Sequence, residues 1–391
     1  HTEKYVLSPL FWFGKLCVIS ASNFETKNIV WYKFYSIVII VLTLSFCTWS
    51  AIERWYQFDQ YIYYNVFVFD IVTIVLLPLI SVLLIVNAIF IKGKRIKKLL
   101  ENLMDPDYLV DRVNVTVMQK RRKFIIVELI IVHILMILLY IDYMLSNMVT
   151  LEWSFYTDIL FYISEYIMAM EVLHICNYAL SIRYKIVMLN VALVQSVKQI
   201  LGKDSRNFVT TSRTPSYLHR HLTTYSKLCN VIDSYNDCFG LQIFGILFVG
   251  VIYTTYTIFL IFIYASEKIT PKRDVSVVFL LIYYIHDSFN YVIFGAMITI
   301  SCTLASQAAQ RTARICCKLL LNISMSSKSF HERLLRRELL QFAERVSQRQ
   351  IHFEACGFLT IDYNTFYSLL GSTAMNVIIL LQFQKQGNSK I

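Results

Sequence analysis

The sequence predicts an all-α polytopic membrane protein with seven transmembrane helices, and three observations lead to this fold class. Hydrophobic residues make up 57% of the 391 residues, and charged residues only 16%. The mean hydropathy is +0.54. The charged residues also gather in clumps that separate long apolar stretches. Because a soluble domain is typically about 45–50% apolar, this composition favours a membrane protein over a soluble one.

Seven apolar segments of the chain are each close to or above the length of about 20 residues that a helix needs to cross a bilayer. They lie at residues 34–52, 62–91, 124–146, 153–180, 239–265, 275–305 and 358–384. The second, fourth and sixth segments are the longest, so we expect them to tilt or to continue as helices beyond the bilayer. Pro78 lies inside the second segment and predicts a kink there.

The orientation is predicted from the Lys and Arg residues, all 37 of which lie outside the seven segments. Most of them precede the first segment or follow the second, fourth and sixth, and KGKRIKK (92–98) and KRRK (120–123) are the densest clumps. The positive-inside rule therefore predicts a cytoplasmic N-terminus and an extracellular C-terminus. The net charge of +11 is then explained by topology and by contact with anionic lipid headgroups, and no nucleic-acid partner is expected.

These assignments divide the chain into alternating membrane and cytoplasmic parts. The predicted parts are a cytoplasmic N-terminal segment (1–33), transmembrane helices 1 to 4 (34–180), a cytoplasmic helical extension (181–238), transmembrane helices 5 and 6 (239–305), a cytoplasmic anchor helix (306–356), a seventh transmembrane helix (357–384) and an extracellular tail (385–391). The cytoplasmic parts are predicted to be helical extensions of the spans rather than featureless loops.

One of the cytoplasmic segments carries an amphipathic pattern. Within residues 327–353, one apolar stripe is formed by Leu335, Leu339, Phe342 and Val346, with Arg and Glu opposite. Such a stripe needs an apolar partner. We expect this helix and the neighbouring extensions to pack together and against another subunit, although a helix lying on the membrane surface would show the same pattern.

The sequence predicts no cofactor, no metal site and no enzyme. The nine cysteines and eight histidines show none of the spacings that are typical of metal ligands. An HExxH motif is absent, and His219 and His221 form an isolated pair in a segment that is predicted to be cytoplasmic.

The last part of the chain carries the most specific motif, CGFLTIDYNTFYSLLGSTAMNVIILLQFQ (356–384). Residues 357–362 follow the pattern Gly, two apolar residues, any residue, an apolar residue and Asp, and residues 377–383 are five apolar residues followed by Gln-Phe. This arrangement resembles the C-terminal signature of insect gustatory receptors. A Thr-Tyr pair in that signature is replaced here by Met375-Asn376.

The resemblance implies a tastant-gated cation channel in the plasma membrane of sensory neurons, with a sugar or a bitter compound as the tastant. Four subunits would assemble, as a homotetramer or as a heteromer with related receptors, and the last helix of each would line one central pore. The outer halves of the first six spans would hold the tastant. The alternative is a seven-helix receptor that signals through G proteins. Such receptors have the opposite orientation, and the chain lacks their DRY motif after the third span and their NPxxY motif in the last.

The resemblance also implies which residues line the pore. Counting back from Gln382 in helical steps gives one face, made of Ile379, Met375, Ser372 and Ser368. Ile379 and Gln382 would form the constriction, because packed apolar side chains exclude water and hydrated ions. Phe383 would pack behind the pore against neighbouring spans. Without the resemblance, the same pattern also fits an ordinary buried or lipid-facing helix.

Ionisable and aromatic side chains inside the spans are the candidate tastant contacts. Ionisable groups within a membrane usually mark a function, and small-molecule pockets combine aromatic walls with a few polar groups. The candidate ligand-binding residues are Glu165, Tyr162, Tyr166, Tyr253, Tyr256, Tyr283, Tyr284, His286, Asp287 and Asn290. The alternative is that each acid pairs with a histidine or hydroxyl of a neighbouring span and that each tyrosine only packs. A structural role is the main expectation for Asp70 and Asp142.

Overall fold

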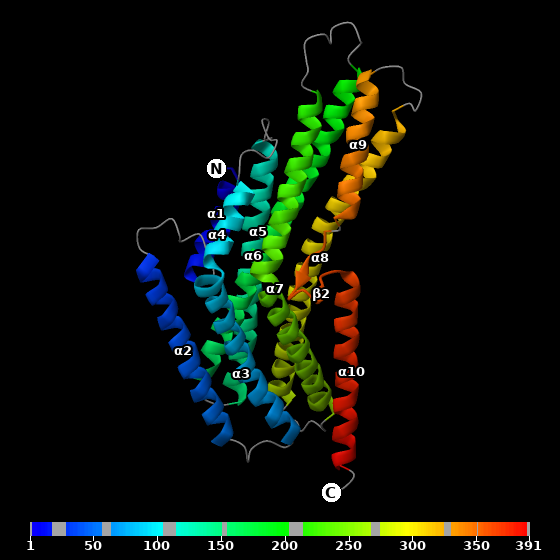
Figure 1. Ribbon diagram of the computed structural model, residues 1–391. Coiled ribbons are helices and arrows are strands. Elements are labelled where there is room, and N and C mark those ends of the chain that lie inside the picture. The colour runs from blue at the N-terminus through cyan, green and yellow to red at the C-terminus, as the bar shows by residue number, and fades with distance from the viewer. Residues whose placement is uncertain are drawn as a thin grey trace.

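The computed structural model describes the helices of the chain and most of what connects α9 (Phe330–Gln348) to α10 (Tyr363–Asn388). The described residues are 2–17, 29–56, 64–104, 115–150, 155–202, 214–266, 274–323, 330–349 and 351–388. Their helices run along the long axis of an elongated bundle (Figure 1). One end of the bundle carries α9, and α10 ends at the opposite end; we call these the α9 end and the α10 end.

Seven helices of the described chain contain a segment that is long and apolar enough to cross a membrane. They are α2 (Ile29–Tyr56), α3 (Tyr64–Val86), α5 (Val115–Thr150), α6 (Phe155–Gly202), α7 (Thr214–Ser266), α8 (Asp274–Leu321) and α10. Each predicted segment corresponds to one of these helices, so the predicted fold class is confirmed. The helix α3 continues through Pro78 and is followed by the π-helical turn η3 (Asn87–Ile91).

Three helices are much longer than a bilayer requires. The helices α6, α7 and α8 have 48, 53 and 48 residues, which is more than twice the length of about 20 residues that spans a bilayer. They continue towards the α9 end, where α9 packs against α7 and α8 (Figure 1). The predicted helical extensions of the fourth, fifth and sixth spans are therefore confirmed.

The apolar stripe of α9 faces its own chain. Its four members Leu335, Leu339, Phe342 and Val346 are all buried. The Phe342 ring meets the ring of Tyr225 in α7 edge to face, with 6.1 Å between the ring centroids. The predicted stripe is thus confirmed, and its partners are α7 and α8 rather than a membrane surface.

The N-terminal segment contains a helix that the sequence analysis does not predict. The helix α1 (Thr2–Leu16) packs against α5 and α6. It buries Val6, Leu7 and Leu10, which lie three to four residues apart and so share one helical face. Residues 2–16 therefore form a helix whose apolar face joins the common core.

A second helix that is not predicted lies in the basic clump after the second span. The helix α4 (Gly93–Met104) buries Leu99 and its apolar neighbours. Lys92 Nζ donates a hydrogen bond to Asp237 Oδ1 of α7 at 2.8 Å, and Arg95 pairs with the same carboxylate. Part of the clump is therefore neutralised within the chain instead of facing only lipid headgroups.

A β-hairpin separates α9 from α10, and here the structure differs from the prediction of one anchor helix followed directly by a span. Strand β1 (Glu354–Ala355) pairs antiparallel with β2 (Leu359–Thr360). The turn between them contains Cys356 and Gly357, with φ values of 55° and 74°. Two successive residues with positive φ reverse the chain direction instead of continuing a helix. The last span therefore begins only at Tyr363.

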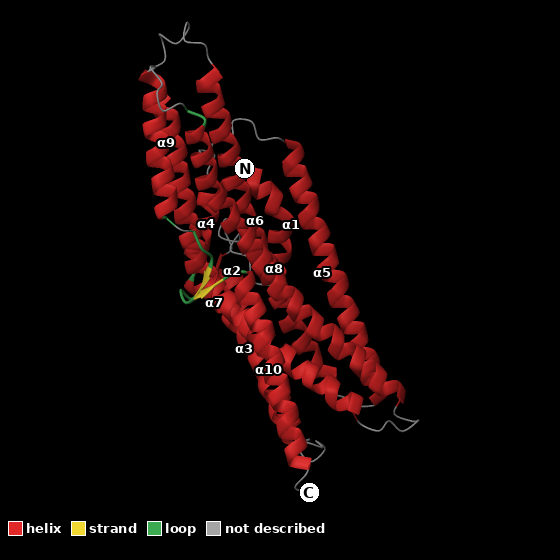
Figure 2. Ribbon diagram, turned by 90° about the vertical axis from the view of Figure 1, so that its right-hand side faces the viewer, coloured by secondary structure: helices red, strands yellow, loops and turns green. Residues whose placement is uncertain are grey.

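The hairpin is held against α7, as Figure 2 shows for the two strands drawn in yellow. Asn236 Nδ2 of α7 donates a hydrogen bond to the backbone oxygen of His352 at 2.9 Å, and Asn236 Oδ1 accepts one from the backbone N–H of Glu354 at 3.2 Å. One asparagine side chain thus satisfies two backbone groups next to β1 and fixes the hairpin on the long helix.

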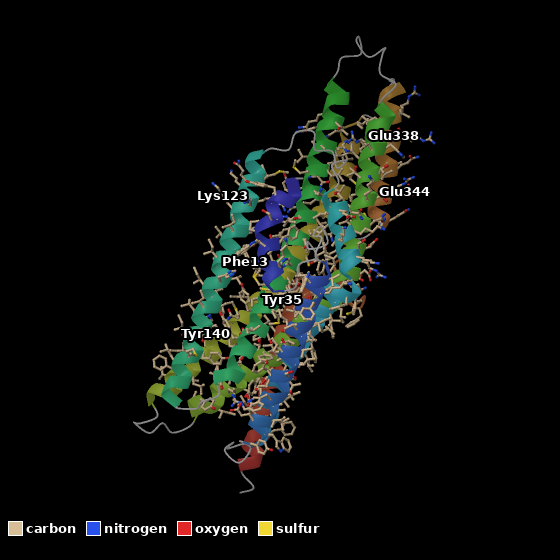
Figure 3. All side chains as sticks on the ribbon, turned by 90° about the vertical axis from the view of Figure 1, so that its left-hand side faces the viewer. Phe13, Tyr35, Lys123, Tyr140, Glu338 and Glu344 are labelled. Carbon is tan, nitrogen blue, oxygen red and sulfur yellow. The ribbon has the colours of Figure 1, made fainter. Side chains whose placement is uncertain are left out.

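Charged and apolar surfaces are separated along the axis of the bundle. Figure 3 labels Glu338 and Glu344 near the α9 end and Lys123 in the same half of the molecule, whereas Tyr140 lies near the α10 end. Between Lys123 and Tyr140, the helix α5 exposes apolar side chains such as Ile134, which is 52% exposed. Such an apolar outer surface is typical of helices that face lipid.

Candidate functional site

A cavity of about 130 Å³ lies among six helices, in the half of the bundle near the α10 end. Its wall combines aromatic, aliphatic, hydroxyl and charged side chains from α2, α3, α5, α6, α7 and α8. The lining residues are Phe46, Cys47, Ser50, Arg54, Asp70, Thr73, Ile74, Pro78, Leu139, Tyr162, Glu165, Tyr253, Tyr256, Thr257, Tyr283, Tyr284 and Asp287. Aromatic walls with a few placed polar groups are what a small-molecule site requires.

The cavity brings together seven of the ten residues that the sequence analysis proposes as ligand contacts. These are Tyr162, Glu165, Tyr253, Tyr256, Tyr283, Tyr284 and Asp287. They come from three helices, α6, α7 and α8, so only the fold places them around one space. Their contact with a ligand stays a prediction.

The other three proposed contacts do not line this cavity. Tyr166 Oη lies 2.8 Å from His133 Nε2 of α5, and His286 Nδ1 lies 2.8 Å from Asp142 Oδ2 of α5. Asn290 is buried in α8. The pairing of Asp142 with His286 is the kind of contact between neighbouring spans that the sequence analysis names as the structural alternative.

An ion pair in the cavity wall was not predicted as part of the site. Arg54 Nε lies 3.6 Å from Asp70 Oδ2, and Tyr256 Oη donates a hydrogen bond to Asp70 Oδ1 at 3.3 Å. Arg54 lies between the first two predicted segments, 34–52 and 62–91, and the sequence analysis expects a structural role for Asp70. The sequence does contain one feature from which this pairing could have been predicted. Both residues flank the connection between the first two spans, so they lie at the same end of adjacent helices.

Two acidic side chains meet in the cavity wall. Glu165 of α6 and Asp287 of α8 are only 1% and 2% exposed, and their side chains interact with each other. Among the described residues, Glu165 Oε1 and Asp287 Oδ1 have no hydrogen-bond partner. Buried polar atoms normally have one, so this pair leaves acceptor capacity that the fold itself does not use.

Tyr253 connects the cavity to a second, smaller one. Its hydroxyl donates a hydrogen bond to the backbone oxygen of Thr73, and its ring stacks on that of Tyr291 with 4.9 Å between the centroids. Tyr291 lines a cavity of about 30 Å³ that Phe366 and Thr373 of α10 also line. The stacked ring pair therefore lies between the main cavity and α10.

In the described part of the chain, the helix α10 packs on the bundle through one face and exposes the opposite one. It packs on α7 and α8, and Thr373 and Val377 are each 4% exposed. The proposed pore face points away from this contact: Met375 is 60% and Ile379 40% exposed.

The remaining proposed pore residues are exposed as well. Ser372 and Gln382 are exposed on α10, and Phe383 is 60% exposed. Most of the Phe383 side chain is therefore uncovered in the described part of the chain, and its predicted packing against neighbouring spans stays a prediction. The pore role of these residues stays a prediction.

Together, the seven candidate spans, the internal cavity and the exposed last helix are the features of a polytopic membrane protein with a cavity inside its helical bundle. The chain belongs to a family described as 7tm chemosensory receptor, whose model matches residues 4–387. No curated protein matches the sequence. Among solved structures, the chain is similar to the insect olfactory receptor OR5 from Machilis hrabei, with a TM-score of 0.63 and 14% identity over 97% of this chain and 99% of that one.

The same receptor in complex with eugenol gives a comparable result. Its TM-score is also 0.63, with 13% identity over 98% of this chain and 99% of that chain. At such low identity the likeness establishes the fold, which extends over nearly the full length of both chains. The assignment to the chemosensory receptors rests on the family match.

Proposed function

We propose that the chain is a gustatory receptor that acts as a tastant-gated cation channel in the plasma membrane of sensory neurons. The tastant, a sugar or a bitter compound, binds in the main cavity, and the last helices of four subunits line one central pore. The N-terminus is cytoplasmic and the C-terminus extracellular. Two features carry the proposal. One is a cavity among six helices that is lined by both apolar and polar side chains. The other is the opposite face of α10, which is exposed in the described part of the chain.

The polarity of the exposed face supports a pore. Ser368, Ser372 and Gln382 are all exposed on α10. Polar side chains are unfavourable against lipid tails, where nothing satisfies their hydrogen bonds. Four copies arranged around an axis, whether identical or from related receptors, would turn these residues towards water. Ile379 and Gln382 would then form the constriction. The packed Ile379 side chains would close it, because a narrow apolar ring loses its water and blocks hydrated cations.

The stacked tyrosines transmit ligand binding in the cavity to α10 as a movement of their rings. A tastant that contacts Tyr253 alters the position of its ring, and the stacked Tyr291 ring moves with it against Phe366 and Thr373 of α10. Outward movement of α10 widens the ring of Ile379 side chains. The Gln382 amides then line a wider, wetted opening.

Whole-cell recording from cells that express this chain alone, with G-protein signalling blocked, tests the proposal. A fast cation current during application of sugars or bitter compounds is the expected result. A response that requires active G proteins would overturn it.

Cysteine substitution on α10 tests the pore assignment within the same recordings. In Ile379→Cys, a charged thiol reagent should block the current, because the side chain faces the pore. Val377→Cys is the matched control: it lies two residues away on the buried face of α10, and its current should not change. Block of both variants or of neither would argue against a pore lined by this face.

A further inference from the structure

We infer that the cavity selects ligands that carry a cationic nitrogen, an amine or a quaternary ammonium, and holds that nitrogen beside Glu165 and Asp287. The inference rests on the proposed ligand-binding role of the cavity and narrows its ligand class. Three observations carry it: the acidic pair with unused acceptors, the absence of a compensating cation among the described lining residues, and the ring-rich wall.

The acidic pair is the first observation. Glu165 Oε1 and Asp287 Oδ1 have no hydrogen-bond partner among the described residues, although both side chains are almost completely buried. Both residues line the cavity. Two carboxyl groups at close range in a medium of low polarity repel each other when charged. A cation between them removes that repulsion and uses the free acceptors, whereas a neutral ligand only uses the acceptors.

The charges of the other lining residues do not compensate the pair. Among the described lining residues, Arg54 is the one basic residue, and it pairs with Asp70. His286, on the same helix as Asp287, pairs with Asp142 and does not line the cavity. The described lining therefore offers the acidic pair no partner of opposite charge, and a cationic ligand can supply one.

The aromatic rings in the cavity wall around the acidic pair also favour a cationic ligand. The described lining contains five tyrosines: Tyr162, Tyr253, Tyr256, Tyr283 and Tyr284. The rings of Tyr283 and Tyr284 lie 5.5 Å apart, and Tyr284 stacks on Tyr264 at 6.0 Å. Aromatic faces attract cations, and clustered rings are a common way to bind quaternary ammonium groups. A sugar would also stack on rings, so charge is the property that separates the two ligand classes.

The test compares two probes of the same shape and different charge. Choline carries a quaternary ammonium whose charge does not depend on pH, and neohexanol has a carbon atom in place of the nitrogen. Each is titrated against the purified full-length receptor in detergent, and its affinity is taken from the rise in unfolding temperature. Choline should bind about tenfold or more tightly than neohexanol. Equal binding of the two, or stabilisation by glucose alone, would overturn the inference.

Two conservative variants assign the effect to the acidic pair. Glu165→Gln and Asp287→Asn keep the side-chain shape and each remove one carboxyl group of the pair, so both should fold. Each should reduce the preference for choline over neohexanol to less than about threefold. Asp142→Asn is the matched control, because Asp142 lies outside the cavity lining and pairs with His286; it should keep the full preference. A preference that survives both cavity variants would contradict the role of the pair.

The ring wall is tested with a substitution pair that does not depend on the acids. Tyr283→Phe keeps the aromatic face and should keep the choline preference, whereas Tyr283→Leu should weaken it. Because these are binding measurements, they are separate from the channel proposal. Choline binding without any current would support the inference about the ligand class and contradict the channel proposal. A current from neutral tastants, without a preference for charged ligands, would support the channel proposal and contradict the inference.

Discussion

Gly240 lies where the hairpin touches the long helix α7. A Cβ atom at this position would be 2.9 Å from the backbone nitrogen of Cys356 and 3.3 Å from the backbone oxygen of Glu354. Both are backbone atoms, so a flexible side chain cannot move away to make room. Only glycine therefore allows the hairpin to approach α7 this closely, and this contact supports the start of α10.

The variant Gly240→Ala should destabilise the protein by about 1–3 kcal/mol, the usual range for overpacking. Gly250→Ala in the same helix is the matched control, because the nearest atom to its Cβ would be Tyr291 O at 4.0 Å. Thermal unfolding in detergent should show a lower midpoint for Gly240→Ala alone. Equal midpoints for the two variants would mean that the hairpin is not pressed against α7.

Single residues of the site differ in how well the sequence predicts them. Glu165 and Asp287 stand out, because an acidic residue in an apolar segment is rare and usually functional. Arg54 carries no comparable signal, since a single cation at the end of a span resembles a topology marker. Tyr166 and His286 have suitable chemistry but face other helices. Spans that are apolar all round do not indicate which face turns inward, so only packing separates these cases.

At the scale of the element, α9 combines one buried and one exposed face. Leu339 is 0% exposed and its neighbour Leu340 is 59% exposed. The buried stripe attaches α9 to α7 and α8, and the exposed face remains available to another subunit. The proposed tetramer would use that exposed face, together with the ends of the long helices, as its anchor.

Alanine substitution of these two leucines should separate folding from assembly. Leu339→Ala should lower the stability by about 2–5 kcal/mol, because it leaves a cavity in a buried contact. Leu340→Ala should change the stability of the single chain by no more than about 0.5 kcal/mol. Thermal unfolding gives the first quantity.

Size-exclusion chromatography of the folded receptor completes the comparison. Leu340→Ala should weaken the association of the subunits while the chain stays folded. A loss of stability in Leu340→Ala equal to that in Leu339→Ala would contradict the observed burial. An unchanged tetramer fraction would exclude this face of α9 from the anchor.

Long elements are predicted better than short ones. The seven spans follow from apolar length alone, and the α9 stripe repeats over three turns, so both are visible in the sequence. The helices α1 and α4 are short, and their formation depends on the core they join. The strands β1 and β2 have two residues each, which is too short for an alternating pattern to be recognised. The missed elements are therefore those that tertiary contacts create.

At the scale of the whole molecule, the main prediction is the orientation of the bundle in the membrane. The basic clumps gather towards the α9 end, and the positive-inside rule assigns that end to the cytoplasm. One glycosylation sequon, Asn322-Ile323-Ser324, follows α8 at that end, and the other, Asn114-Val115-Thr116, begins outside the described residues. Both lie on the predicted cytoplasmic side, where no glycan is added.

Epitope tags at the two ends of the chain test this orientation. In intact cells, an antibody should reach a C-terminal tag, and it should reach an N-terminal tag only after the membrane is permeabilised. Treatment with an endoglycosidase should leave the mobility of the protein on a gel unchanged. A glycan on Asn322, or an accessible N-terminal tag, would reverse the orientation and with it the position of the cavity.

The hairpin between α9 and α10 also bears on how such receptors diversify. It contains only two paired residues per strand, and no helix runs across it. A genetic crossover between β1 and β2 would therefore join the anchor of one receptor to the last helix of another without cutting a helix. The ladder between the strands is formed by backbone groups, which are the same in every sequence. The hairpin is thus a suitable site for joining two receptor sequences. Chimeras joined there should fold more readily than chimeras joined within α9 or α10.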